Sequence, residues 1–281
     1  MRVRDIRDDI FSGICERNVT ACIVADDEGL VVETSAMAGE ATALGLNMRR
    51  ILEEGSPVLR GDEIALFDGR PREIAMAEER LIGIMAKPSG IATAARRFVE
   101  RAGRRPEIVA GAWKKMPPSQ KEVIRRAVAR GGASCRISNV PFIYLDKNYV
   151  RIFGGIRPCL AAVSGLDGYL KVIQLKGEYG AIDLEAAEAV TCGADIIFID
   201  TGHAGDISSA AGRLRQLRRR DGAKIAFGGG IRLEDVAMLK TLDVDILDVG
   251  RSIVDAPLLD LRMEVIDAAP GRKEEGRHRT V

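Results

Sequence analysis

The sequence predicts an α/β protein in which a mixed N-terminal region precedes a parallel α/β barrel. Up to about residue 88 the chain shows short segments of alternating polarity, and beyond it short apolar strands alternate with helical segments. These later strands are apolar on both faces, as the strands of a parallel sheet covered by helices must be. Six strand–helix units follow one another, and about six to eight such units around a closed sheet form a barrel.

The N-terminal region is expected to contain four short strands. The last two flank the turn signal Arg60-Gly61-Asp62, so we expect them to pair as a β-hairpin. The four strands are expected at residues 21–24, 29–33, 57–59 and 63–67.

The barrel region is expected to begin with a helix over Pro88–Ala102, because proline is favoured at the first helical position. A second helix, Ser119–Arg130, carries the capping box Ser119-x-x-Glu122 and stops at Gly131-Gly132. Further helices are expected at residues 184–191, 207–219, 233–242 and 257–267. Strands are expected at residues 108–110, 141–145, 172–175, 195–200, 224–227 and 245–249.

Composition and charge disfavour nucleic acid and membranes as partners. The 281 residues are 46% apolar and 30% charged with a formal net charge of +1, which gives no electrostatic reason to bind polyanions. The basic run at residues 213–220 has leucines three apart and is interpreted as the solvated face of an amphipathic helix. No apolar run approaches the ~20 residues that cross a bilayer. The N-terminal MRVRDIRDDIFSG is too acidic for a signal peptide.

The cysteines and histidines disfavour disulfides, structural zinc and histidine triads. The five cysteines are widely spaced without a C-x-x-C pair, so we expect free thiols in a reducing cytoplasm. Only two histidines are present, His203 and His278. A zinc site or a histidine-based triad therefore lacks ligands.

Glycine-rich segments follow the last two predicted strands. Gly228-Gly229-Gly230 comes after one strand, and Gly250-Arg251-Ser252 comes after the next. Glycines let a phosphate approach backbone N–H groups, and a helix N-terminus adds partial positive charge. In barrels the last two strand–helix loops often bind phosphate, and Arg251 can add a charge-assisted bond. Alternatively, these glycines serve left-handed turns with no ligand.

Charged side chains are expected at the same strand ends. Asp200 ends an apolar strand and could hold ribose hydroxyls or Mg²⁺, or could instead cap a helix or form an ion pair. The segment Trp113-Lys114-Lys115 follows the first barrel strand, and Asp146-Lys147 follows the second, with Arg136 ahead of it. Together these groups suggest an anionic substrate with two parts, although any single lysine on a loop is weak evidence.

Two neighbouring motifs link the chain to a known family. Ala77-Glu78-Glu79-Arg80-Leu81-Ile82-Gly83 is followed by Lys87-Pro88-Ser89-Gly90-Ile91-Ala92-Thr93. This pattern resembles the quinolinate phosphoribosyltransferases, also called carboxylating nicotinate-nucleotide pyrophosphorylases. The similarity runs from about residue 20 to residue 266 and includes the glycine segments described above.

The resemblance implies an N-terminal α/β sandwich domain, residues 1–103, followed by an incomplete parallel α/β barrel, residues 104–270. The final helix would pack back on the first domain, and we expect residues 271–281 to be disordered. The family's reaction joins a pyridine acid to 5-phosphoribosyl diphosphate with Mg²⁺, releasing pyrophosphate and CO₂. Family members are dimers or larger, and Arg80 matches an arginine that completes the partner's site.

The chain departs from the family at several site positions. A family Asp-Thr-Arg-Lys-Thr run falls on Gly111-Ala112-Trp113-Lys114-Lys115, which replaces an arginine by Trp113. Cys135-Arg136 lacks the family's histidine, and Asp146-Lys147 exchanges two charges. The family's Glu-x-Glu strand falls near Ile173 and Leu175, with Gln174 and Glu178 close by.

By this resemblance the catalytic residues would be Lys114 and Asp200, and the metal ligands Asp200 and Glu178. The substrate-binding residues would be Arg80, Trp113, Lys115, Arg136 and Lys147. Our hypothesis is that Trp113 stacks on a planar ring whose anionic part these cations hold. Alternatively, Trp113 fills an abandoned site. Two rival functions remain open: a non-catalytic metabolite-binding paralogue, and a barrel phosphosugar isomerase or synthase using Asp146 and Asp200 as an acid–base pair.

Overall fold

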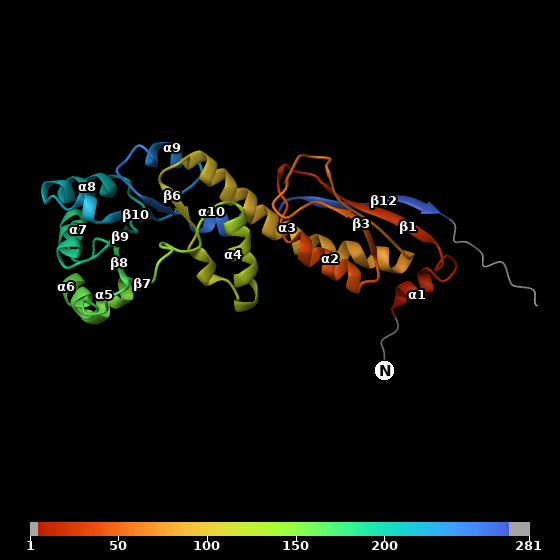
Figure 1. Cartoon of the computed structure of the whole chain (residues 1–281), viewed down its shortest axis with the longest axis horizontal. Helices are drawn as coiled ribbons and strands as arrows, with labels where there is room; N and C mark the ends of the chain where they lie inside the picture. The colour runs from red at the N-terminus through yellow and green to blue at the C-terminus, as the bar shows by residue number, and fades with distance from the viewer. Residues whose placement is uncertain (1–4, 270–281) are drawn as a thin grey trace, which may run out of the picture. The chain divides into compact units, whose positions relative to one another are not determined.

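The structure is a computed structural model that describes residues 5–269, except for the side chains of Trp113 and Ala269. The chain divides into two compact units, one of residues up to Thr93 together with those from Pro257, and one of Ala94–Ala256. The predicted disordered tail, residues 271–281, lies outside the described residues. Figure 1 labels the elements along the chain.

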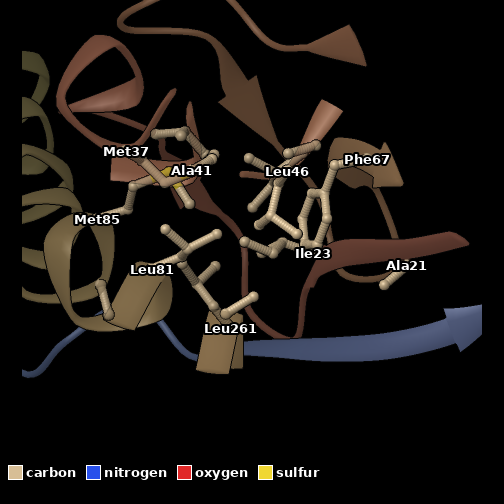
Figure 2. Close-up of a cluster of buried hydrophobic side chains, with 14 of the residues drawn as sticks. Ala21, Ile23, Met37, Ala41, Leu46, Phe67, Leu81, Met85 and Leu261 are labelled. Carbon is tan, nitrogen blue, oxygen red and sulfur yellow. The ribbon is translucent and has the colours of Figure 1, made fainter. Parts of the chain in front are cut away.

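The first unit is built on an antiparallel sheet of order β12-β1-β5-β3. Its strands and helices are α1 (Ile6–Ile10), β1 (Asn18–Ala25), β2 (Gly29–Leu30), α2 (Thr34–Ala43), β3 (Asn47–Ile51), β4 (Pro57–Val58), β5 (Glu63–Gly69), the part of α3 (Pro71–Ala102) up to Thr93, and β12 (Leu261–Ala269). Side chains of α2 and α3 pack against one face of this sheet, as Figure 2 shows for Met37, Leu81, Met85, Ile23 and Phe67. This helix-on-sheet packing confirms the predicted α/β sandwich.

Three local predictions in this unit are wrong. The strands around Arg60-Gly61-Asp62 do not pair with each other, because β4 pairs with β2 while β5 pairs with β1 and β3. Pro88 does not open a helix but lies buried inside α3, which Pro71 opens seventeen residues earlier. The apolar neighbours Met85 and Ile91 are buried on both sides of Pro88, and this packing outweighs the lost N–H of one proline.

Residues 257–267 were expected as a helix, but the structure forms the edge strand β12 from Leu261 onward. Leu261 and Met263 contribute to the core of the first unit, whereas Glu264 to Ala268 are exposed. The spacing of two between the inward residues is that of a strand, and the antiparallel ladder with β1 satisfies its backbone.

The second unit is a six-stranded parallel sheet of order β6-β11-β10-β9-β8-β7. Its two edge strands are the first two along the chain, so the barrel is incomplete, as predicted. Strands and α-helices are β6 (Glu107–Val109), α4 (Lys121–Arg130), β7 (Phe142–Leu145), α5 (Lys147–Phe153), α6 (Ile156–Ala161), β8 (Leu170–Leu175), α7 (Ile182–Thr191), β9 (Ile196–Ile199), α8 (Gly205–Gln216), β10 (Lys224–Gly228), α9 (Val236–Leu239), β11 (Ile246–Asp248) and α10 (Arg251–Val254). Three short 3₁₀ helices are η1 (Ala112–Lys115), η2 (Pro118–Gln120) and η3 (Arg220–Gly222).

The barrel interior is filled by side chains from neighbouring strands, including Val109, Val172, Phe198, Ala226 and Ile246. This apolar filling separates the amino ends of the strands from their carboxyl ends, so the unit offers two polar faces for chemistry.

Three helices of the second unit differ from the sequence prediction. The capping box at Ser119 is absent, because Ser119 lies in η2 and α4 begins with Gln120 as N-cap without a side-chain bond. Helices α5 and α6 were not predicted; Asp146 starts α5 by accepting the backbone N–H groups of Asn148 and Tyr149 at 2.9 and 3.2 Å.

Candidate active site

The carboxyl ends of six parallel strands bring most of the predicted site residues to one edge of the sheet. Lys114 and Lys115 lie in η1 after β6, Lys147 follows β7, and Glu178 follows β8. Asp200 follows β9, and the two glycine segments follow β10 and β11. Ser134 bridges β6 in parallel at Val109, and the side chain of Arg136, two residues later, contacts the ring of Phe142 at the start of β7.

Asp200 lies at the centre of a hydrogen-bonded cluster that joins three strands. Its Oδ2 accepts from Gln174 Nε2 at 2.6 Å and from Lys176 Nζ at 3.2 Å. Gln174 Oε1 in turn accepts from the Lys147 backbone N–H at 2.9 Å. Lys176 also contacts the Asp200 carbonyl. The cluster fixes the Asp200 carboxylate while leaving its side chain 26% exposed, so a polar ligand can still reach it.

Asp248 is a site residue that the sequence analysis missed. This last residue of β11 accepts the Gly111 backbone N–H at 3.0 Å, and a Cβ on Gly111 would lie 3.1 Å from its Oδ2. Burial raises the pKa of Asp248, and the nearby Asp200 charge adds to this, whereas the hydrogen bond from Gly111 and the charge of Lys114 lower it. Asp248 lies within a predicted strand and not after it, and an acid inside the apolar segment Ile246–Val249 is the sequence signal that marks it.

Tyr144 of β7 was also missed, and it lies among the same charges. Lys114 Nζ lies 5.7 Å from the centre of its ring, within range of a cation–π contact. Burial raises the pKa of Tyr144 well above its usual range, and the carboxylates of Asp248, Asp200 and Asp146 add to this effect. The phenol therefore stays neutral and can act as a hydrogen-bond donor at this edge.

The β10 loop closely approaches the β9 loop. Gly229 has φ +114, and a Cβ there would lie 2.6 Å from the Gly202 backbone nitrogen. Gly230 has φ +79 and nothing within 4 Å of an added Cβ, so its backbone is open to a ligand. Gly228 serves packing, since a Cβ there would lie 2.8 Å from the ring of Phe198.

The β11 loop presents Gly250 as the N-cap of α10, followed by the exposed Arg251. Ser252 Oγ donates to the Ile231 carbonyl at 2.6 Å. Ser252 thus ties the two glycine loops together, and its hydroxyl is engaged within the protein.

Several predicted site residues have other partners. Arg80 lies on α3 in the first unit, where it forms an ion pair with Glu40. Glu178 accepts Arg151 Nε and Nη2 at 2.8 and 2.5 Å, and this pairing lowers the pKa of Glu178. The Arg136 guanidinium lies 5.2 Å from the centre of the Phe142 ring. The side chain of Trp113 lies outside the description, so the stacking hypothesis stays a prediction.

Within residues 5–269, no group of three or more His, Cys, Asp or Glu side chains is placed to hold a metal ion by itself. No helix among the same residues is both long and apolar enough to cross a membrane.

The open parallel barrel, with glycine loops and a fixed carboxylate at one edge, has the form of a sugar-phosphate-handling enzyme. The family of the quinolinate phosphoribosyl transferases, C-terminal domain, matches residues 91–264. The chain belongs to this family, which confirms the resemblance noted in the sequence and the assignment as a pentosyltransferase-type enzyme.

Relatives and solved structures agree with this membership. A probable carboxylating nicotinate-nucleotide pyrophosphorylase of Archaeoglobus fulgidus is 28% identical over 263 residues, 89% of this chain and 98% of the relative. The human carboxylating nicotinate-nucleotide pyrophosphorylase is 26% identical over 80% of this chain and 74% of its own. The crystal structure of NadC from Streptococcus pyogenes has a TM-score of 0.78 at 19% identity, covering 95% of this chain and 93% of that one; it supports the fold.

Proposed function

We propose that the protein transfers the 5-phosphoribosyl group from 5-phosphoribosyl diphosphate to quinolinate or another planar anionic acceptor. The observation that carries this proposal is the Asp200–Gln174–Lys176 cluster beside the open backbone of Gly230 at one edge of a family barrel. The names of the relatives, carboxylating nicotinate-nucleotide pyrophosphorylases, support quinolinate as the first acceptor to test.

In the proposed site, the backbone of Gly229-Gly230 and the loop of Gly250-Arg251 receive the 5-phosphate of the donor. Asp200 orients the ribose through its hydroxyls, since Gln174 and Lys176 hold its carboxylate in one place. Lys114, Lys115 and Lys147 stabilise the negative charge of the departing diphosphate as the ribose gains oxocarbenium character. No protein nucleophile is required.

Mg²⁺ fits the site as a substrate-bound ion that Asp200 would help to hold. Mg²⁺ is commonly bound by one or two carboxylates plus substrate phosphates. Gln174 and Lys176 both bind Asp200 Oδ2, so Oδ1 is the oxygen of Asp200 that would bind the ion. Glu178 fits less well, because Arg151 engages both of its oxygens. The ion would supply charge neutralisation to the diphosphate.

The acceptor is proposed to bind near η1 and β7, with its ring on Trp113 and its anionic group held by Lys114 and Arg136. The neutral Tyr144 would donate a hydrogen bond to it. Quenching of the lone tryptophan's fluorescence by quinolinate or nicotinate checks the stacking, since an unquenched signal at saturating ligand would contradict it.

The proposal includes a cytoplasmic homodimer or larger assembly in which Arg80 of one subunit completes the site of another, as the family pattern implies. Breaking the Arg80–Glu40 pair with Glu40→Gln leaves the arginine in place, whereas Arg80→Gln removes it. We expect Arg80→Gln to raise the KM for the acceptor about tenfold, because a charge-assisted bond is lost.

One rival function retains support from a specific observation. The engagement of Glu178 by Arg151 leaves fewer acidic groups for a metal, as expected of a non-catalytic metabolite-binding paralogue. The isomerase alternative is weakened, because the Asp146 carboxylate caps α5. This hydrogen bonding makes Asp146 less suited to act with Asp200 as an acid–base pair.

The deciding experiment measures pyrophosphate release by the pure protein with 5-phosphoribosyl diphosphate, Mg²⁺ and quinolinate, with mass spectrometry of the products. Nicotinate and other ring acids are tested in parallel. We expect pyrophosphate and a phosphoribosylated acceptor in equal amounts. Donor binding without turnover on every acceptor would overturn the transferase proposal in favour of the paralogue.

A further inference from the structure

We propose that the opposite face of the barrel, at the amino ends of the strands, contains a second binding site for a phosphate-bearing small molecule. An open hollow of about 950 Å³ lies there, in the size range of sites for metabolites. Leu170, Ile196 and Lys224, which begin β8, β9 and β10, are among its lining residues. The hollow thus lies at the other end of the sheet from Asp200 and the glycine loops.

The wall of this hollow is a rigid arginine–aspartate cluster. Arg220 donates to Asp243 Oδ1 at 2.7 Å, to Asp245 Oδ2 at 2.9 Å and to the Ala223 carbonyl at 2.9 Å. Its side chain is only 15% exposed. Arg215 binds the other oxygen of Asp243 at 2.8 Å. These pairs neutralise the two aspartates and fix the shape of the wall without consuming the remaining cations.

Three further cations, Arg105, Arg218 and Lys224, line the hollow, and all three residues are exposed. None of them has a side-chain partner among the described residues. The lining also holds two further carboxylates, Asp221 and Asp195, the latter accepting the Lys171 backbone N–H at 2.7 Å. The three cations therefore exceed these two carboxylates by one positive charge. The cations come from three separate segments, so they can contact several phosphate oxygens of one ligand at once.

Arg218 occupies a backbone position that would favour glycine. It follows α8 with φ +53, and the bonds from Arg218 N to the Arg215 carbonyl and from Arg219 N to the Leu214 carbonyl form a Schellman motif. An arginine at that left-handed position costs free energy that a glycine would not. We infer that the side chain offsets this backbone cost by placing a guanidinium at the wall of the hollow.

Apolar side chains at the base of the hollow can also contact an uncharged part of the ligand. Leu170 and Ile196 belong to the interior core of the barrel and also line the hollow. A second hollow of about 360 Å³ shares Arg105, Lys224 and Asp245 with the first. The ligand class is therefore a multiply charged phosphate ester with a compact organic body.

Inorganic tripolyphosphate at low ionic strength serves as the probe in calorimetric titrations of the full-length protein. We expect the double variant Arg218→Gly, Lys224→Ala to weaken its binding at this face by about tenfold or more. Arg219→Ala is the matched control, because Arg219 adjoins Arg218 but does not line the hollow, and it should bind as the wild type does. Thermal unfolding verifies that each variant is folded.

A third variant distinguishes the two faces of the barrel. Arg251→Ala alters the glycine-loop end only, so the amino-end binding event should persist in it. Loss of all tripolyphosphate binding in Arg251→Ala would place the probe at the glycine loops and overturn the proposal. Unchanged affinity in the double variant, or no binding to the wild type, would overturn it as well.

Discussion

The two ends of the same parallel sheet use charge in different ways. At the carboxyl ends, Asp200 is fixed by Gln174 and Lys176 yet remains partly exposed, and Asp248 is half-buried with a raised pKa. At the amino ends, Arg220 and Arg215 saturate Asp243. The carboxyl ends leave an acidic group partly exposed to a ligand, whereas the amino ends pair Asp243 and Asp245 with arginines and leave further cations exposed beside them. Substitutions at the carboxyl ends should therefore change activity more than stability, and the reverse should hold for the arginine–aspartate cluster.

The largest effect is expected from Asp200→Ala. Loss of the carboxylate that orients the ribose should lower kcat/KM about 100- to 1000-fold, while the unfolding free energy changes little. Steady-state pyrophosphate release and urea unfolding measure the two quantities. Asp221→Ala is the control at the amino end, since this exposed aspartate lies far along the strands from the glycine loops. Equal losses of activity in both variants would break the distinction between the two ends.

The next largest effect is expected from Arg220→Ala, which should destabilise the fold by about 2–4 kcal/mol because it leaves Asp243 and Asp245 without their main partner. Turnover at a temperature where the variant is folded should remain near the wild-type value. Arg219→Ala, with the same loss of charge at an exposed position, should stay within about 0.5 kcal/mol.

The Arg220 effect should also depend on pH. Burial raises the pKa of Asp243, but bonds from Arg220 and Arg215 outweigh it, so the net pKa is lowered. The stability that this pair contributes is present above the unfolded pKa of about 3.9 and is lost as pH falls through the lower folded value. Urea midpoints of Arg220→Ala and wild type should therefore converge in acid, and a constant difference down to strongly acidic pH would contradict the assignment.

A smaller effect of opposite sign is expected from Asp248→Asn. The folded pKa of Asp248 is raised, so its contribution to stability is full below about pH 3.9 and falls as pH rises through the folded value. The asparagine oxygen can still accept the Gly111 N–H without a buried charge. At neutral pH the variant should be as stable as the wild type or more stable by about 1 kcal/mol, measured by urea unfolding. A strong destabilisation at pH 8 would mean that the ionised carboxylate is required.

How far the sequence predicted this molecule depends on the range of the interactions involved. The glycine loops and Asp200 were predicted because a strand followed by glycine or by an acid is a local pattern. Pro88 was misassigned because the burial of α3 outweighs the local preference of proline for a helix start. Residues 261–267 were misassigned because their partner strand β1 lies more than 200 residues away in the sequence. Asp146 and Glu178 were predicted as site residues, but both side chains are engaged by helix α5, which was not predicted. Asp146 is the N-cap of this helix, and Arg151 of the same helix forms an ion pair with Glu178.

The smallest effect sharpens the comparison at the amino ends. Arg218→Gly should stabilise the fold by about 0.5–1 kcal/mol, because glycine relieves a left-handed cost of about 1–2 kcal/mol but has a more flexible unfolded chain. Arg218→Ala retains the strained φ of +53 and removes the same cation, so it is the matched control. Urea unfolding should place the glycine variant above the alanine variant by about 1 kcal/mol. If the alanine variant were the more stable of the two, the arginine would sit there without backbone strain, and its position would no longer argue for a ligand.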